Sequence, residues 1–317
     1  MRILIVKTSS LGDVIHNLPV VSDIRRHFPD AVVDWCVEDS FAAIPRLHPG
    51  VGKIIPVAVR RWRKNLFKVA SWQEIAEFRR GLQAYLYDAV VDTQGLLKSA
   101  LMARRANGPA FGYDASSARE PMAAWLYDRK FSVSRELHAV VRNRRLAAAA
   151  LGYAADDEPN YGIEAAPAGF TWLPHRPYAV FLTATSRDDK LWPEANWLAL
   201  GRHLNAQGIS AVLPGGSPVE RERASRLAAG IPGAVAAPAM SIPDLASLLA
   251  GGRAAVGVDT GLTHLAAALK VPTVALYTAT DPGLTGVLGV GFYRNLGGKD
   301  QIPSPAAVLA ELQSALA

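Results

Sequence analysis

A single carboxylate, Asp13, follows the first apolar run of the chain and is set among small polar residues. The run MRILIV leads into KTSSLGDVIHNLP, so Ser10, Gly12 and Asp13 are expected where a strand gives way to a helix. In an open α/β sheet, ligands bind outside the carboxyl ends of the strands. A carboxylate at that place can act as a general base on a bound hydroxyl, or it can only cap the helix that follows.

Three more polar or glycine-rich loops are expected at strand ends, all in the second half of the chain: TATSRDDKLWPE (183–194), LPGGSPVERE (213–222) and VDTGLTHLAAAL (258–269). In the first loop, the hydroxyls of Thr185 and Ser186 and the charge of Lys190 suit a diphosphate. In the second, a glycine turn before a helix is compatible with a nucleotide. The second half should therefore hold a shared ligand.

The third of these loops gives the clearest signal. Asp259 and Thr260 can cap a helix that begins near Gly261, and His264 falls on its first turn. Gly261 lets a ligand approach the free backbone N–H groups, and the helix dipole favours an anion there. The alternative is a plain capped helix.

Several common chemistries have no motif in the chain. A Walker sequence and a GxGxxG after a strand are absent, which argues against a P-loop hydrolase and a conventional dehydrogenase. The histidines are scattered, with no HExxH and no paired aspartates in a loop after a strand, so we expect no metal. A diphosphate leaving group would then be neutralised by Lys190, hydroxyls and helix N-termini.

Composition sets wider limits. The 317 residues are enough for two domains, and Cys36, the single cysteine, excludes an internal disulfide. No apolar run reaches the roughly 20 residues of a membrane-spanning helix, and the start of the chain lacks the layout of a secretory signal. The single cysteine fits a reducing cytoplasm. The net charge of +6 suggests an acidic partner, namely nucleic acid, an anionic membrane or a phosphorylated substrate. The excess is concentrated in VRRWRKNLFK (59–68), which alternatively is a solvated face.

Strands and helices should alternate in two separate runs. The expected strands are 2–7, 31–37, 53–57, 87–93, 178–184, 209–215, 254–260 and 272–278. The expected helices are 13–27, 71–83, 96–106, 194–207, 218–229, 243–250, 261–269 and 304–316, with a helix-rich stretch at 120–151. This order predicts an α/β protein with two doubly wound, Rossmann-like domains facing a central cleft. We place the domains at 1–160 and 178–317 with a linker at 161–177, and expect helix 304–316 to pack back on the N-terminal domain.

Four segments together resemble the lipopolysaccharide heptosyltransferases of glycosyltransferase family 9, which have the GT-B fold. They are KTSSLGDVIHNLPVVSDIRR, RRWRK, TSRDDKLWPE and GVDTGLTHLAAAL, and they follow the family's order across nearly the whole chain. SLGD with DTGLTH is typical of heptosyltransferases in general. KTSSLGDVIH with RRWRK is similar to the branch that adds the first heptose.

The resemblance implies a reaction without a cofactor. ADP-L-glycero-β-D-manno-heptose would donate heptose, with inversion, to the inner Kdo (3-deoxy-manno-octulosonic acid) of Kdo2-lipid A. Asp13 matches the family's base, and the N-terminal domain would bind the acceptor and the C-terminal domain the donor. The implied donor residues are Thr185, Ser186, Lys190, Glu220, Met240, Asp259, Thr260, Gly261 and His264, with Glu222 as an alternative to Glu220. The implied acceptor residues are Ser10, Gly12, Arg60, Arg61, Arg63, Lys64 and Arg119.

Two other functions remain open at this point. One is another family-9 enzyme, such as a heptosyltransferase II, with a different acceptor. The other is a non-catalytic nucleotide- or nucleic-acid-binding module, for which Trp62 and Phe67 would be the stacking residues. For the leading interpretation we expect no nucleic-acid partner, and a cytoplasmic enzyme that binds peripherally to the anionic inner face of the inner membrane.

Overall fold

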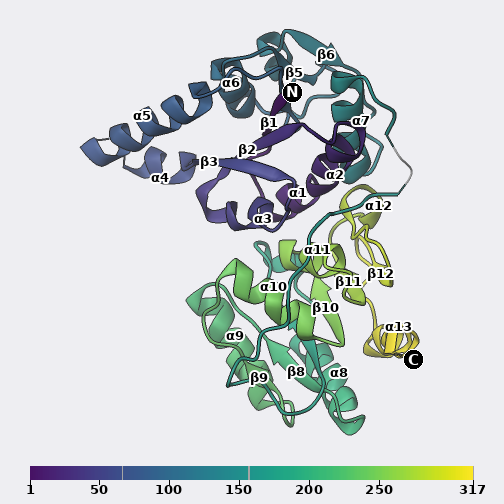
Figure 1. Cartoon of the computed structure of the whole chain (residues 1–317). Coiled ribbons are helices and arrows are strands. Elements are labelled where there is room, and N and C mark those ends of the chain that lie inside the picture. Colours follow the sequence, from purple (N-terminus) through teal and green to yellow (C-terminus); the bar gives the residue numbers. More distant parts are fainter. Residues whose placement is uncertain (66, 156–157, 317) are drawn as a thin grey trace. The chain divides into compact units, whose positions relative to one another are not determined.

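Each half of the chain folds as a separate α/β unit. The computed structural model describes residues 1–65, 67–155 and 158–316, and the chain divides into unit 1, Met1–Gly162, and unit 2, Ile163–Ala317 (Figure 1). Among the described residues, none of the helices combines the length and the apolar character needed to cross a membrane.

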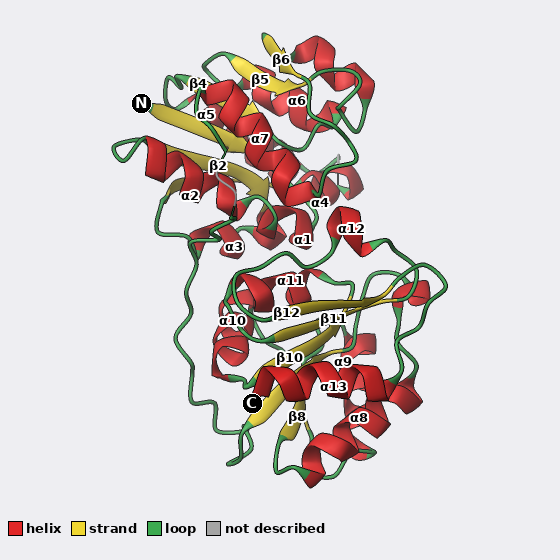
Figure 2. Ribbon diagram, turned by 90° about the vertical axis from the view of Figure 1, so that its right-hand side faces the viewer, coloured by secondary structure: helices red, strands yellow, loops and turns green. Residues whose placement is uncertain are grey.

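Unit 1 contains one parallel sheet with the strand order β3-β2-β1-β4-β5-β6. Its strands are β1 Arg2–Val6, β2 Val32–Glu38, β3 Val51–Val57, β4 Ala89–Asp92, β5 Ala110–Tyr113 and β6 Arg129–Phe131. Its helices are α1 Leu11–Ile15, α2 Leu18–His27, η1 Asp39–Phe41, α3 Ala43–Arg46, α4 Val59–Lys64, α5 Val69–Gln83, α6 Leu97–Arg105, η2 Pro121–Leu126 and α7 Ala139–Leu151. The central strands β1 and β4 are apolar on both faces because helices cover both sides of the sheet (Figure 2).

Unit 2 repeats this arrangement with the order β12-β11-β10-β7-β8-β9. Its strands are β7 Tyr178–Leu182, β8 Ser210–Leu213, β9 Val235–Ala236, β10 Ala254–Val258, β11 Thr273–Tyr277 and β12 Tyr293–Gly297. Its helices are η3 Asp188–Lys190, α8 Glu194–Ala206, α9 Pro218–Ala229, α10 Ile242–Gly251, α11 Gly261–Ala268, α12 Pro282–Thr285 and α13 Pro305–Leu316. Both units thus have the doubly wound Rossmann order, and the predicted fold class is confirmed.

The same strand order gives each unit a switch point, where the chain turns from building one side of the sheet to building the other. In unit 1 this point lies between β1 and β4, and in unit 2 between β7 and β10. The carboxyl ends of parallel strands share one edge of a sheet. Ligands of such sheets bind at that edge, beside the switch point.

Two sequence-based expectations need correction. The helix predicted over 13–27 is two helices, α1 and α2, because Pro19 has no N–H to donate and starts a new helix at its first turn. The last helix, expected to pack on the N-terminal domain, buries Val308 and Leu312 in the core of unit 2, against α8, β10 and β11.

The core of unit 2 fixes the loop that carries Lys190. Trp192 is fully buried two residues further on and meets Trp197 edge-to-face, with 4.9 Å between ring centroids. Its indole N–H donates to the carbonyl of Pro303 at 2.8 Å. The chain after η3 is therefore held by packing on one side and by a buried hydrogen bond on the other.

In unit 1, a buried ion pair joins α2 to α7. Arg144 donates from Nε to Asp23 Oδ2 at 2.7 Å and from Nη2 to Asp23 Oδ1 at 3.1 Å, and both side chains are at most 5% exposed. Removing one member of such a pair leaves a buried charge without compensation.

We therefore expect Arg144→Met to lower the free energy of unfolding by about 3–5 kcal/mol, measured by urea denaturation. The matched control is Arg104→Met, which removes the exposed pair with Asp128 and should cost less than about 1 kcal/mol. Equal losses in the two variants would show that burial does not set the strength of the Arg144–Asp23 pair.

Candidate functional site

The switch point of unit 1 is built from the loops that follow β1 and β4. The Gln94 side chain joins them: its Oε1 accepts from the N–H groups of Thr8 at 2.9 Å and Ser9 at 3.2 Å, and its Nε2 donates to the Ser9 carbonyl at 2.7 Å. These three bonds fix the backbone between β1 and the first turn of α1.

Two buried charged residues support this loop. Asp92 accepts hydrogen bonds from Ser99 Oγ and Tyr127 OH, both at 2.7 Å, and from the backbone N–H of Gln94 at 2.8 Å. Burial raises the pKa of Asp92 while these hydrogen bonds oppose the rise. Lys7 donates from Nζ to the Thr93 carbonyl at 2.9 Å; burial lowers its pKa, and the carboxylates of Asp13 and Asp92 partly counter that effect.

Asp13 lies in the first turn of α1, half-buried. Its Oδ2 accepts from the Ser10 N–H at 2.7 Å and from Ser10 Oγ at 3.1 Å, so Ser10 and Asp13 form a capping box at the helix start. The two roles predicted for Asp13, general base and helix cap, are compatible. The cap fixes the orientation of the carboxylate at the edge of the sheet where ligands of such folds bind.

Other predicted acceptor residues lie along the same edge. Helix α4 follows β3, two strands away from β1, or roughly 10 Å at the usual strand spacing. Glu38, at the end of β2, links the two: its N–H donates to the Thr8 carbonyl at 3.1 Å, and its Oε1 accepts from the Arg60 N–H at 3.4 Å. Arg119 follows β5 on the other side of β1 and is exposed.

The basic residues of α4 do not form one uniform group. Arg60, Arg63 and Lys64 are exposed. Arg61 pairs with Asp39 at 3.1 Å and Glu74 at 2.9 Å, which raises its pKa. The run VRRWRKNLFK contains no acid, but Arg61 finds its acidic partners in η1 and α5, which are distant in the sequence.

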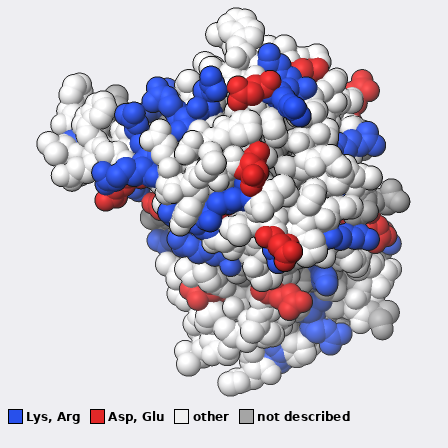
Figure 3. Space-filling view, turned by 45° about the horizontal axis from the view of Figure 1, so that its top comes forward, with Lys and Arg blue, Asp and Glu red and all other residues white. Residues whose placement is uncertain are grey.

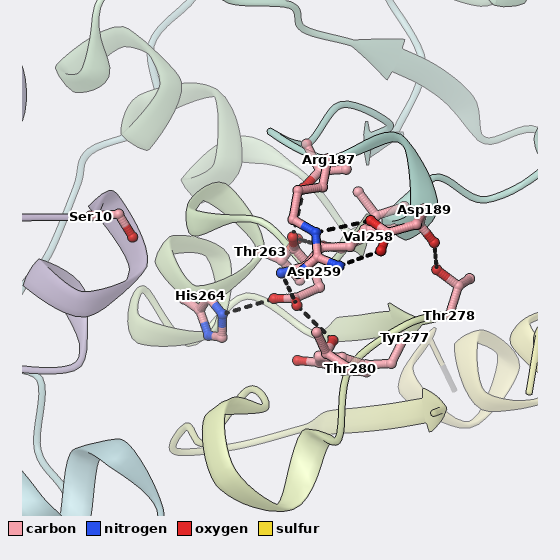
Figure 4. A network of polar contacts seen from close by, with 12 residues as sticks. Ser10, Arg187, Asp189, Val258, Asp259, Thr263, His264, Tyr277, Thr278 and Thr280 are labelled. Carbon is pink, nitrogen blue, oxygen red and sulfur yellow. Dashed lines mark hydrogen bonds and ion pairs between the residues drawn. The ribbon is translucent and has the colours of Figure 1, made fainter. Parts of the chain in front are cut away.

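The switch point of unit 2 is built around Asp259. Lys190 Nζ donates to Asp259 Oδ2 at 2.7 Å and so joins the loops after β7 and β10. Thr280 Oγ1, after β11, donates to the same oxygen at 2.7 Å, and His264 Nε2 is 4.0 Å from Oδ1 (Figure 4). Thr185 Oγ1 donates to the Asp259 carbonyl at 3.0 Å.

One expectation for this loop is wrong. Asp259 was predicted to help cap α11, but its carboxylate binds Lys190 and Thr280, whose charge and hydroxyl satisfy it. Thr260 is the N-cap residue by position, without a side-chain cap bond. By position, the N–H groups of Gly261 and Leu262 have no intrahelical acceptor, whereas that of Thr263 donates to the Thr260 carbonyl at 3.1 Å. This end therefore keeps N–H donors for an anion.

The other predicted donor residues follow β7, β8 and β9 at the same edge of the sheet. Glu220 Oε2 accepts from the N–H groups of Gly216 at 2.8 Å and Ser217 at 2.9 Å, so it caps α9. Met240 lies just before Ser241, the N-cap of α10. Ser186 is exposed in the loop after β7.

Sequence reasoning missed four residues of these two arrangements: Lys7, Asp92, Gln94 and Thr280. Each stands within three residues after, or at the end of, a strand that was itself predicted, and that position was the available signal. Among the residues that the structure describes, no three His, Cys, Asp or Glu side chains are grouped so as to hold a metal ion.

Comparison with known proteins gives the family. Residues 75–300 match the model of glycosyltransferase family 9 (heptosyltransferase). Lipopolysaccharide heptosyltransferase 1 of Salmonella typhimurium is 48% identical over 293 residues, covering 91% of this chain and 92% of that protein.

Two solved structures are also similar. E. coli heptosyltransferase WaaC with ADP has 44% identity and a TM-score of 0.92, over 99% of this chain and 100% of that chain. The same E. coli enzyme with ADP-2-deoxy-2-fluoro heptose has 43% identity and a TM-score of 0.87, over 99% of each chain. The chain belongs to glycosyltransferase family 9, the heptosyltransferases.

Proposed function

We propose that the protein transfers L-glycero-D-manno-heptose from ADP-L-glycero-β-D-manno-heptose to the inner Kdo of Kdo2-lipid A, in the synthesis of the lipopolysaccharide inner core. The observation that carries this proposal is the 48% identity, over nine tenths of the chain, to a relative named lipopolysaccharide heptosyltransferase 1. Polar clusters at both switch points support it, because the reaction needs a base for the acceptor and an anion site for the donor.

Unit 2 is the proposed donor-binding domain. The Lys190 ammonium group has three N–H donors and donates one to Asp259, so the other two can bind the diphosphate. Thr185, Ser186 and the N–H groups at the start of α11, from Thr260 and Gly261, would add neutral donors to the same oxygens. Asp259, which pairs with Lys190, and His264, 4.0 Å from Asp259, would bind the heptose hydroxyls.

The nucleoside would extend along the sheet edge toward β8 and β9. Met240 would contact the adenine, and Glu220 would bind a ribose hydroxyl. Glu220 already caps α9 by accepting two backbone N–H groups, so this carboxylate would hold the helix and the ribose together. Glu222 remains the alternative acid for the ribose.

Unit 1 is the proposed acceptor-binding domain, with Asp13 as general base. The Asp13 carboxylate would take the proton from the acceptor hydroxyl, whose oxygen then forms a bond to the anomeric carbon as the bond to the diphosphate breaks. ADP leaves with that electron pair, and Lys190 with the start of α11 stabilises its charge. Ser10 orients Asp13 through two hydrogen bonds, and Gly12 would let the acceptor approach the backbone beside the carboxylate.

The acidic groups of the acceptor would be bound by the exposed cations of the same edge. Arg60, Arg63 and Lys64 on α4 and Arg119 after β5 are available for this, and guanidinium groups suit phosphates and carboxylates. Arg61 would contribute mainly by holding α4 against Asp39 and Glu74. An acceptor embedded in lipid and the net charge of +6 favour peripheral association with the anionic inner face of the inner membrane.

The direct test of the function is ADP release from ADP-heptose with two acceptors, deacylated Kdo2-lipid A and the same molecule already carrying its first heptose. We expect release only with the first. Release only with the second would identify an enzyme of the next transfer step, and release with neither would reject the proposal.

Asp13→Asn should lower kcat by about 10²–10⁴-fold and leave the dissociation constant of ADP-heptose unchanged, because a base is lost from the acceptor side only. Single-turnover kinetics and calorimetry measure the two quantities. Ser10→Ala, which keeps the carboxylate and removes one of its donors, should have a much smaller effect. Near-normal turnover of Asp13→Asn would show that Asp13 only caps the helix and is not the general base.

Lys190→Ala should weaken ADP-heptose binding by roughly 10–100-fold, the loss expected for hydrogen bonds from a charged group. The matched control is Arg187→Ala, three residues earlier in the same loop, where an exposed arginine pairs with Asp189. EDTA should leave wild-type turnover unchanged in this assay. Strong inhibition by the chelator would show that a divalent ion shares the charge of the diphosphate with Lys190.

The double variant Arg60→Ala/Arg63→Ala should raise the KM for the acceptor by about 10–100-fold while the KM for the donor stays constant. The reason is that the donor residues belong to the other unit of the chain. Kinetics with each substrate varied in turn separate the two constants. A raised donor KM with an unchanged acceptor KM would contradict the role given to α4.

A further inference from the structure

The outer end of α5 presents apolar side chains to solvent. Phe67, just before the helix, is completely exposed, Val69 is 72% exposed and Trp72 is 59% exposed. Isolated exposed apolar residues are ordinary, but here a phenylalanine, a valine and a tryptophan fall within six residues of sequence. We call these three residues the apolar tip.

The core of unit 1 does not need these side chains. The inner face of α5 is formed by Ile75, Phe78 and Leu82, and Phe78 packs against Trp62 of α4 with 5.7 Å between the ring centroids. At 100° per residue, Val69 lies on the opposite side of the helix and Trp72 on its flank, about 60° from Ile75. The first turn of α5 is thus apolar outside the face that packs.

Positive charge predominates around the apolar tip. Lys64 and Lys68 flank Phe67 in the sequence, and Arg79 and Arg80 lie two to three turns further along α5; all four are exposed, as is the acid Glu77 of the same helix. Glu74, 40% exposed, accepts from Trp62 Nε1 and binds Arg61. Figure 3 shows Lys and Arg side chains, with some Asp or Glu below them, beside the white projection at the left of the view, where α4 ends and α5 begins.

We propose that the apolar tip inserts into the interfacial layer of an anionic lipid bilayer. Tryptophan is enriched at the level of the lipid headgroups, phenylalanine occurs with it on the apolar face of interfacial helices, and exposed lysine and arginine bind anionic headgroups. An excess of cations around exposed aromatic groups matches an anionic bilayer surface. The proposal rests on the membrane association proposed above and names the side chains that enter the lipid.

Insertion and charge act as two separate attachments. The electrostatic part is screened by salt, with a screening length of about 3 Å near 1 M, whereas transfer of apolar surface out of water is not weakened by salt. The tip would hold unit 1, with its proposed acceptor residues, at the depth of the sugar headgroups of a lipid-linked acceptor.

The test is co-sedimentation with vesicles of phosphatidylglycerol and phosphatidylethanolamine. We expect Phe67→Ser/Trp72→Ser to lower the partition coefficient by about 10–100-fold, from the apolar surface that no longer enters the lipid, and expect this difference to persist near 1 M salt. The matched control is Leu86→Ser, which removes a side chain 73% exposed just beyond the other end of the same helix and should change nothing. Phe67→Ser alone, at a fully exposed position, tests the same point without risk to the fold.

A label measures insertion directly. Cys36 is fully buried, so a cysteine introduced by Val69→Cys can be modified selectively with a dye whose emission reports polarity. Vesicles should shift the emission of dye at position 69 to the blue and leave dye at position 86, introduced by Leu86→Cys, unchanged. Equal responses at the two positions would overturn the proposal.

Two further results would also reject insertion. One is an unchanged partition coefficient in the double serine variant. The other is a wild-type dimer in sedimentation equilibrium without lipid that the double variant dissociates, since the tip would then be a contact between copies. Turnover of a water-soluble, deacylated acceptor should be the same in wild type and variant. If the protein fails to transfer heptose but partitions as described, the transfer proposal fails and the insertion stands.

Discussion

The ion pair between Lys190 Nζ and Asp259 Oδ2, 2.7 Å long, holds together the part of unit 2 on which its proposed chemistry depends. It joins the loops that follow β7 and β10, the two strands on either side of the switch point. Thr280, in the loop after β11, donates to the same oxygen. Both charged side chains are largely buried, at 17% and 11% exposure, so the pair is shielded from solvent screening. The start of α11 is thereby fixed beside an ammonium group, and the two together are the proposed site for the diphosphate.

In unit 1, hydrogen bonds from one side chain, rather than an ion pair, hold the loops of the switch point together. Gln94 ties the loop after β4 to the loop after β1 through three hydrogen bonds, and Ser10 then orients Asp13. Lys7 and Asp92 lie buried behind this arrangement with pKa values moved by desolvation in the direction of their neutral forms. The same Rossmann order thus supports a cation at one switch point and a carboxylate at the other, and the difference comes from the residues placed in the loops.

How much the sequence predicts depends on whether a property is local. The long apolar strands and the strand-end loops at Asp13, Lys190 and Asp259 follow from periodicity and turn composition, and the fold class follows from their alternation. The strands β5, β6, β9 and β12 do not, because β6 and β9 have only three and two residues, and β5 and β12 contain glycine or polar residues in place of a continuous apolar run. The partners of Arg61 and of Asp259 come from distant segments, so no local rule finds them, and Pro19 was overlooked as the start of a second helix.

The most direct measurement of the central claim is the anomeric configuration of the heptose in the product, read by NMR after incubation of the protein with the β-configured donor and deacylated Kdo2-lipid A. A single displacement assisted by Asp13 inverts the anomeric carbon, so the account predicts an α-linked heptose and one ADP released per linkage formed. A β-linked product would require two displacements and a nucleophile that the account does not contain. ADP release without a sugar linkage would show hydrolysis. Either result would contradict the mechanism assigned to these two switch points.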